Sequence, residues 1–237
     1  PIKLKYSKHF RVSFTLAEVL ITLGIIGVVA ALTLPTVVQS YKKKVVETRM
    51  AKFYTTFNEA IKLSEAVNGN FMDWEFPVNP DEATAQAWFD KYFRPYIKIL
   101  KTDTLSTKEG GRSVVWLPDG SLVVISSSST WLFFPNSKDY ITTCNDETQN
   151  CYPKEANGGT IWFTFVFAPK TKENETYYKK GLEPYCHANF EVTADNLLNP
   201  AKLQACTPER SNEEHALCAK LIQINGWKIP DNYPFKF

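Results

Sequence analysis

The sequence has few of the residues and none of the motifs on which common enzyme classes depend. Its 237 residues include three histidines and two methionines. No G-x-S-x-G, P-loop, G-x-G-x-x-G or H-E-x-x-H pattern occurs, which argues against the hydrolase, nucleotide-binding and zinc-protease classes. One of the histidines, His9, lies among basic N-terminal residues, so little general-base chemistry can be assigned. We therefore expect no enzyme and no cofactor.

A strong charge of either sign is also absent. The 27 Lys and Arg residues nearly balance the 25 Asp and Glu residues, and the formal net charge is +2. This charge is too small to make nucleic acid an obligatory partner.

One long run of residues does stand out because it is almost free of charge. From Phe14 to Val38 there is no Lys, Arg or Asp, and Glu18 is its single ionisable side chain. About 20 apolar residues are enough to cross a bilayer. A basic stretch, residues 3–11, precedes the run, and no A-x-A-like cleavage site follows it. The run is therefore predicted to remain in the protein as a membrane anchor.

The start of this run resembles a known signature. Ser13-Phe14-Thr15-Leu16-Ala17-Glu18, followed by Gly27 and Pro35, is similar to the N-terminus of type IV pilins and of the pseudopilins of type II secretion. In that family a membrane peptidase removes a short basic leader before a Phe, the new terminus is N-methylated, and a Glu follows four residues later. The family usually has glycine where this chain has Ser13, another small residue.

The resemblance implies processing and assembly roles for particular residues. Cleavage would fall between Ser13 and Phe14, with N-methylation on Phe14. The residues expected to act in assembly are Glu18, Gly24, Gly27 and Pro35.

The position of Glu18 needs a physical explanation even without the family resemblance. A lone carboxylate in hydrocarbon is costly unless it is neutralised. An amino group freed at Phe14 would lie one helical turn away, so a pair within one chain is geometrically possible. In a bundle of parallel helices the carboxylate can instead meet the amine of an adjacent subunit, which would fix the axial register. The alternative is that Glu18 extends to the headgroups as an ordinary near-interface residue. We favour the register role.

The resemblance also predicts function, partners and location. It implies a structural subunit that is held in the bacterial inner membrane and polymerised into a type IV pilus or a type II secretion pseudopilus. The expected partners are other pilin or pseudopilin subunits, the prepilin peptidase and methyltransferase, an inner-membrane assembly platform and membrane lipid. The N-terminus would be cytoplasmic and the globular part periplasmic or extracellular. Two alternatives stay open: a minor pilin or adhesin that binds at a filament tip, and a membrane-anchored enzyme.

The helix is expected to continue beyond the membrane. Apolar residues recur at steps of three and four over Val46, Met50, Phe53, Phe57, Ala60, Ile61 and Ser64, which is the stripe of an amphipathic helix. Asn68-Gly69 supplies a stop. Pro35 is predicted to kink this helix. The alternative is that Pro35 ends the span and a second helix begins near Val37.

The expected organisation has four parts: a leader (1–13), a transmembrane half-helix (14–38), an amphipathic half-helix (39–67) and an extracytoplasmic globular domain (68–237). In the last, we expect a helix from Pro80 to about Phe93, a hairpin around Pro118-Asp119-Gly120, a strand over Thr160–Phe167, and short helices at 193–198 and 211–222. The predicted fold class is therefore α+β. It is pilin-like, with a long, kinked N-terminal helix packed on a small antiparallel sheet.

Five cysteines favour an oxidising compartment, and their odd number leaves one over. Cys144 with Cys151, and Cys206 with Cys218, each bracket a short polar stretch that a disulfide can close. The alternative is a zinc site formed by Cys186, His187, Cys206, His215 and Cys218. No paired C-x-x-C pattern accompanies these residues, so we favour disulfides and expect no metal.

Overall fold

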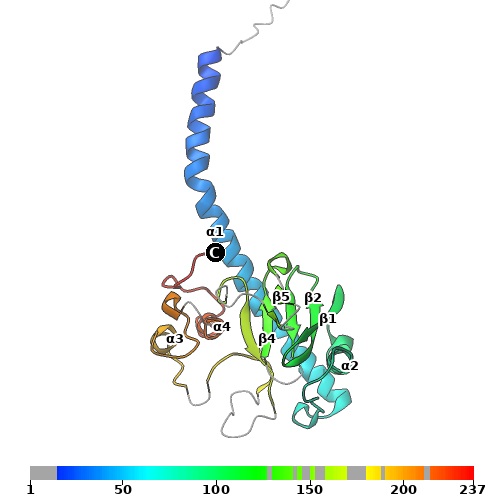
Figure 1. Ribbon diagram of the computed structural model, residues 1–237. Coiled ribbons are helices and arrows are strands. Elements are labelled where there is room, and N and C mark those ends of the chain that lie inside the picture. Colours follow the sequence, from blue (N-terminus) through cyan, green and yellow to red (C-terminus); the bar gives the residue numbers. More distant parts are fainter. Residues whose placement is uncertain are drawn as a thin grey trace, which may run out of the picture. The chain divides into compact units, whose positions relative to one another are not determined.

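The computed structural model describes residues 15–126, 130–140, 143–145, 150–152, 158–169, 180–187, 190–210 and 214–237, with backbone alone for 143–145 and 150–152. The chain divides into two compact units, residues 1–41 and 42–237. One helix, α1 (Leu16–Asn68), contributes to both (Figure 1). This continuous helix contains Pro35, so a separate helix beginning near Val37 is wrong. The predicted kink stays a prediction.

The amphipathic stripe of α1 is confirmed residue by residue. The side chains that α1 buries are Val46, Met50, Phe53, Phe57, Ala60, Ile61 and Ser64. The helix ends at Asn68, and Gly69 follows with a φ of 76°, a left-handed conformation that glycine adopts without a steric penalty. The predicted stop at Asn68-Gly69 is therefore correct.

The second unit is an α+β structure built on an antiparallel sheet. The sheet has the order β1-β2-β3-β4-β7-β8, and every neighbouring pair is antiparallel. Its strands are β1 (Lys101–Thr107), β2 (Gly110–Trp116), β3 (Leu122–Ile125), β4 (Thr130–Phe134), β7 (Phe163–Val166) and β8 (Glu183–Pro184). A separate two-stranded sheet pairs β5 (Thr143–Asn145) with β6 (Asn150–Tyr152).

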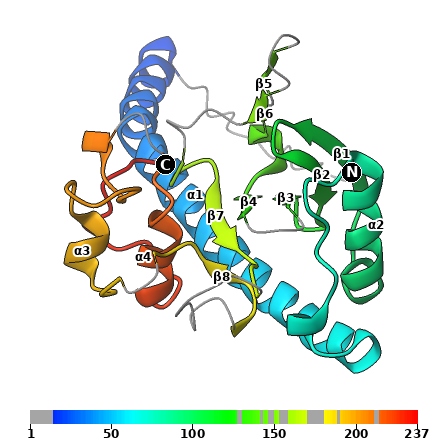
Figure 2. The ribbon, with the colours of Figure 1, turned by 60° about the horizontal axis from the view of Figure 1, so that its bottom comes forward.

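Short helices complete this unit. They are α2 (Glu82–Tyr92), α3 (Ala194–Leu198) and α4 (Cys218–Ile224), with 3₁₀ turns at Phe71–Asp73, Arg94–Tyr96, Ser137–Asp139 and Pro208–Arg210. Helix α2 packs at the β1–β2 end of the sheet and α4 at the β7–β8 end (Figure 2). The sheet is thus flanked by helices at both ends and backed by α1.

Aromatic rings join α1 to the sheet. Phe53 stacks on Phe133 of β4 with ring centroids 4.3 Å apart and meets Phe165 of β7 edge-on at 4.9 Å. Phe57 lies 5.3 Å from the ring of Trp131. All five side chains are at most 2% exposed. Most of the aromatic residues near this interface are therefore core, as their periodic positions indicated.

Asn58 fastens the short edge strand β8 to α1. Its side-chain carbonyl accepts from the Leu182 backbone N–H at 3.0 Å, and its amide nitrogen donates to the Leu182 carbonyl at 2.9 Å. The side chain thus bonds both backbone groups of Leu182. Gly181 makes this approach possible: its φ is 121°, and a Cβ there would lie 2.4 Å from the Asn58 oxygen.

Several predicted boundaries need correction. Helix α2 begins at Glu82 rather than Pro80, because Asp81 is its N-cap and accepts from the Thr84 N–H at 2.7 Å. The strand predicted over Thr160–Phe167 is shortened to β7, since Gly159 turns the chain and Trp162 forms an isolated bridge with Gly158. The hairpin at Pro118-Asp119-Gly120 is confirmed by the β2–β3 register.

The last predicted helix also begins later than expected. Residues 211–213 lie outside the described residues, and α4 starts at Cys218 rather than at 211. The helix predicted at 193–198 is confirmed, with Thr193 as its N-cap.

The structure contains the predicted disulfide between Cys206 and Cys218, whose Cα atoms are 4.7 Å apart. Closing a loop of this size stabilises the fold by about 3 kcal/mol in the chain-entropy account. The bond contradicts the zinc alternative, because two of its five proposed ligands are not thiolates. Cys144 and Cys151 are register partners in β5 and β6, and their side chains lie outside the described residues. Their disulfide stays a prediction. Cys186 is buried, and burial raises the pKa of its thiol.

Candidate membrane-spanning and assembly segment

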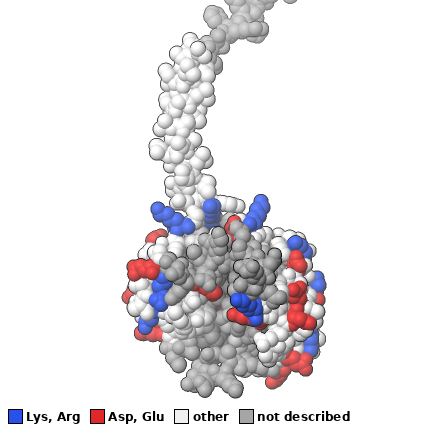
Figure 3. Space-filling view, in the orientation of Figure 1, with Lys and Arg blue, Asp and Glu red and all other residues white. Residues whose placement is uncertain are grey.

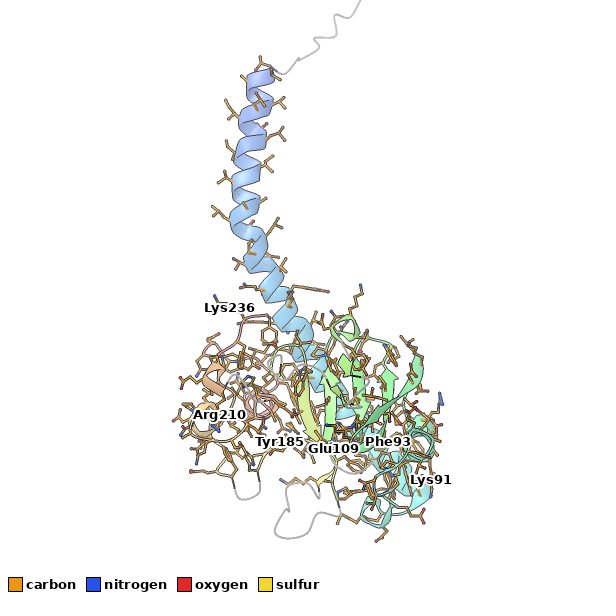
Figure 4. The ribbon with its side chains drawn as sticks, viewed as in Figure 1. Lys91, Phe93, Glu109, Tyr185, Arg210 and Lys236 are labelled. Atoms are coloured by element: carbon orange, nitrogen blue, oxygen red, sulfur yellow. A yellow bond between two sulfur atoms is a disulfide. The ribbon has the colours of Figure 1, made fainter. Side chains whose placement is uncertain are left out.

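The N-terminal part of α1 carries an exposed apolar surface. Its large apolar side chains are from 42% exposed at Val19 to 78% exposed at Leu16. Figure 4 shows these side chains all round the helix. Residues 16 to 38 extend about 34 Å at about 1.5 Å per residue, and the hydrocarbon core of a bilayer is about 30 Å thick. By length and composition, this helix can span a membrane.

Two of the threonine hydroxyl groups within the span bond to carbonyl groups of their own helix. Thr22 donates to the Val19 carbonyl and Thr33 to the Val29 carbonyl, each at 2.9 Å. Polar groups in hydrocarbon need partners from the protein because no water is present. These two threonines therefore do not prevent insertion.

Glu18 lies in the first turn of α1 and has a local partner, Thr15. The Glu18 carboxylate accepts from the Thr15 backbone N–H and from the Thr15 hydroxyl, both at 2.8 Å. The Thr15 hydroxyl in turn accepts from the Glu18 N–H at 3.2 Å. This reciprocal arrangement is a capping box, and it supplies acceptors for backbone N–H groups that have no partner within the first turn of the helix.

The capping box gives Glu18 a partner that was not predicted from the sequence. Its partners were expected to come from Phe14, another subunit or the membrane surface, and Thr15 was missed. The spacing Thr15-x-x-Glu18 could have revealed it, since a Ser or Thr three residues before a Glu is the sequence pattern of this cap. Thr15 supplies hydrogen bonds and no positive charge, so the carboxylate still lacks a counter-ion among the described residues of the span.

The other predicted site residues lie along the same helix. Gly24 and Gly27 are both within α1, and a Cβ at either would meet no described atom within 4 Å. Packing within the chain therefore does not require glycine at these positions. Pro35 lies inside the helix. The structure brings together Glu18 and Thr15, and the predicted cleavage site, Ser13 and Phe14, lies outside the described residues.

The second unit has a shallow groove of about 360 Å³ beside the C-terminal half of α1. Tyr54, Asn58 and Phe71 line it together with Glu59, Glu65, Lys62 and Lys180. Two acidic and two basic side chains line the groove, so their formal charges balance.

A partly buried polar network lies next to this groove. Glu183 accepts from the Tyr54 hydroxyl at 2.9 Å and from the Gln223 amide at 3.2 Å, and Gln223 accepts from the Lys220 ammonium at 2.6 Å. Burial and the Glu183 charge raise the pKa of Tyr54 to about 12, so Tyr54 stays a donor at neutral pH. Burial lowers the pKa of Lys220. The network connects α1, β8 and α4.

Comparison with known proteins gives one family. Residues 36–237 match a family described as "Family of unknown function (DUF6613)". The matched region starts after most of the apolar run and includes the rest of α1 and the whole second unit. No curated protein and no solved structure matches the chain.

Proposed function

We propose that this chain, which belongs to the DUF6613 family of unknown function, is a membrane-anchored structural subunit of the pilin or pseudopilin type. In this proposal the leader before Phe14 is removed, α1 holds the chain in the inner membrane, and the N-terminal helices of successive subunits pack together in a filament. The second unit is carried outside the membrane.

One observation carries this proposal. An uninterrupted helix presents an apolar surface long enough to span a bilayer, with one carboxylate in its first turn. An anchor alone needs no carboxylate, and a charged group in such a segment is expensive. A carboxylate at the start of the helix is explained if it pairs with an amine when helices pack side by side.

The two glycines support the same proposal. Small residues at helix surfaces let neighbouring helices approach closely in lipid. Gly24 and Gly27 lie three positions apart on one side of α1, and the chain itself places no described atom against them. Contact with a second helix would explain why they are small.

The processing step is tested by mass spectrometry of the N-terminal peptide from protein extracted from membranes of the producing cells. We expect the peptide to begin at Phe14 with one added methyl group, because the residues from Ser13 to Glu18 resemble a prepilin cleavage site. Ser13→Gly is the matched variant and should give the same peptide at an equal or greater yield. Recovery of wild-type protein that still carries residues 1–13, together with a soluble chain, would refute the proposal.

A further inference from the structure

Lysines gather at the end of the second unit where α1 enters it. Three of them, Lys42, Lys43 and Lys44, are consecutive, and Lys228 joins them from the C-terminal region. We call these four residues the lysine cluster. Figure 3 shows Lys and Arg side chains projecting at this end of the unit.

Glu47 is what holds Lys228 in the cluster. Its carboxylate accepts from the Lys228 ammonium at 3.2 Å and from the Ile229 backbone N–H at 3.0 Å. The Glu47 side chain is only 13% exposed, whereas those of Lys44 and Lys228 are 66% and 56% exposed. A partly buried carboxylate therefore bonds the C-terminal region to α1 and leaves the ammonium groups facing solvent.

The cluster has more positive than negative charge. Lys44 lies 3.9 Å from the same Glu47 oxygen that binds Lys228, so two cations share one anion. The nearby Lys228 ammonium lowers the pKa of Lys44. Lys42 and Lys43 have no acidic side chain among the contacts described for them. An anion beside these four residues would relieve their mutual repulsion.

The cluster follows the apolar run closely along the chain. Three residues separate Val38 from Lys42, and all belong to the continuous helix α1. At a rise of about 1.5 Å per residue, Lys42 to Lys44 come about 6 to 9 Å after the last apolar position. Headgroup layers of a bilayer are about 5 to 8 Å thick on each side. If the apolar run spans the bilayer, lysine side chains at this position are long enough to reach lipid phosphates.

We propose that the lysine cluster binds the phosphate headgroups of anionic phospholipids in the leaflet next to the second unit. The inference rests on the membrane anchor of the proposed function and adds the class of lipid. The site depends on the fold as well as on the sequence, because 184 positions separate Lys228 from Lys44 and the Glu47 contacts hold Lys228 beside it.

Spin-labelled lipids test this inference in the full chain. The protein is reconstituted into phosphatidylcholine vesicles that contain a trace of spin-labelled phosphatidylglycerol or of spin-labelled phosphatidylcholine, and the motionally restricted fraction of each label is measured. We expect about a fivefold preference for phosphatidylglycerol at low salt, the factor that one lysine near an anionic surface provides. The preference should fall toward one at about 0.5 M salt, where the screening length is only a few ångströms.

Variants test whether the lipid preference depends on the lysine cluster or on exposed lysines elsewhere in the chain. Changing Lys42, Lys43 and Lys44 together to Gln should abolish the preference, and Lys228→Gln alone should reduce it. Glu47→Gln keeps an oxygen for the Ile229 N–H and removes the negative charge, so it should increase the preference. The matched control changes three exposed lysines elsewhere, Lys62, Lys98 and Lys108, to Gln and should have no effect.

The outcomes distinguish this inference from the proposed function. Vesicle flotation after an alkaline wash first shows whether the chain inserts. A chain that does not insert overturns both the membrane anchor and the lipid inference. A chain that inserts and restricts both labels equally, or whose preference survives loss of the lysine cluster, overturns the lipid inference alone.

Discussion

Replacing Glu18 with alanine is expected to leave membrane insertion intact and to abolish assembly. Insertion depends on the apolar residues of α1, and removing a charge from the span makes insertion easier. In the proposed function, assembly depends on the carboxylate, because a neighbour's terminal amine would otherwise be left unpaired in a dry helix bundle. Breaking such a pair costs about 3 to 5 kcal/mol, which weakens each subunit contact by about a hundredfold or more.

The measurement compares the amount of chain in membranes with the amount in sheared, sedimented filaments. Thr15→Val is the matched control, since it removes the hydroxyl of the capping box and keeps the carboxylate. It should still assemble. Normal filaments from Glu18→Ala would show that the pairing role is wrong. Equal loss of filaments in the two variants would show that the cap, and not an intersubunit pair, is what assembly needs.

Replacing Phe53 with alanine is expected to have the largest effect on the stability of the second unit. The ring is 2% exposed and contacts three other rings, those of Phe57, Phe133 and Phe165, at centroid distances of 4.3 to 4.9 Å. Its removal opens a cavity between α1 and the sheet, and Phe→Ala changes of this kind cost about 3 to 5 kcal/mol.

Denaturant unfolding of the full chain in detergent, followed by tryptophan fluorescence, measures this loss. Leu63→Ala on the same helix is the control, because Leu63 is 55% exposed. It should change the free energy of unfolding by about 0.5 kcal/mol or less. Equal effects of the two substitutions would contradict the packing of α1 on the sheet.

Periodicity made α1 the most predictable element of the fold. Its buried stripe from Val46 to Ser64 recurs at helical spacing, and Gly69 follows its last residue. Both the buried residues and the C-terminal end of α1 could therefore be predicted. The β2–β3 hairpin was readable for a similar reason, since Pro118-Asp119-Gly120 separates two β-rich runs. In each case the information lies within a few residues of the element.

Other strands were missed, most of them because their local signal is weak or absent. Strand β1 reads Lys-Thr-Asp-Thr-Leu-Ser-Thr and lies at the sheet edge, where most of its side chains are exposed or half-buried, so it lacks apolar alternation. Strand β4, Thr130–Phe134, is a continuous apolar run without period 2 because it lies in the middle of the sheet. Strand β8 has two residues, too few for any pattern.

Long-range contacts could not be predicted from the sequence either. Asn58 binds Leu182 across 124 positions, and Glu47 binds Ile229 across 182. Both are side chain to backbone bonds, which depend on the fold and not on a pairing of residue types. The Thr15–Glu18 cap of α1 is local, and its spacing would have been enough to predict it, although it was missed.

The most direct test of the account asks which amine Glu18 meets. Filaments assembled from a mixture of isotope-labelled and unlabelled chains are treated with a carbodiimide, which joins carboxylates to nearby amines without a spacer, and the linked peptides are identified by mass spectrometry. The account predicts peptides that join Glu18 of one chain to the Phe14 amine of another, with one labelled and one unlabelled half. Links between Glu18 and Phe14 that never mix the two labels, or filaments in which Glu18 is not linked to Phe14, would contradict it.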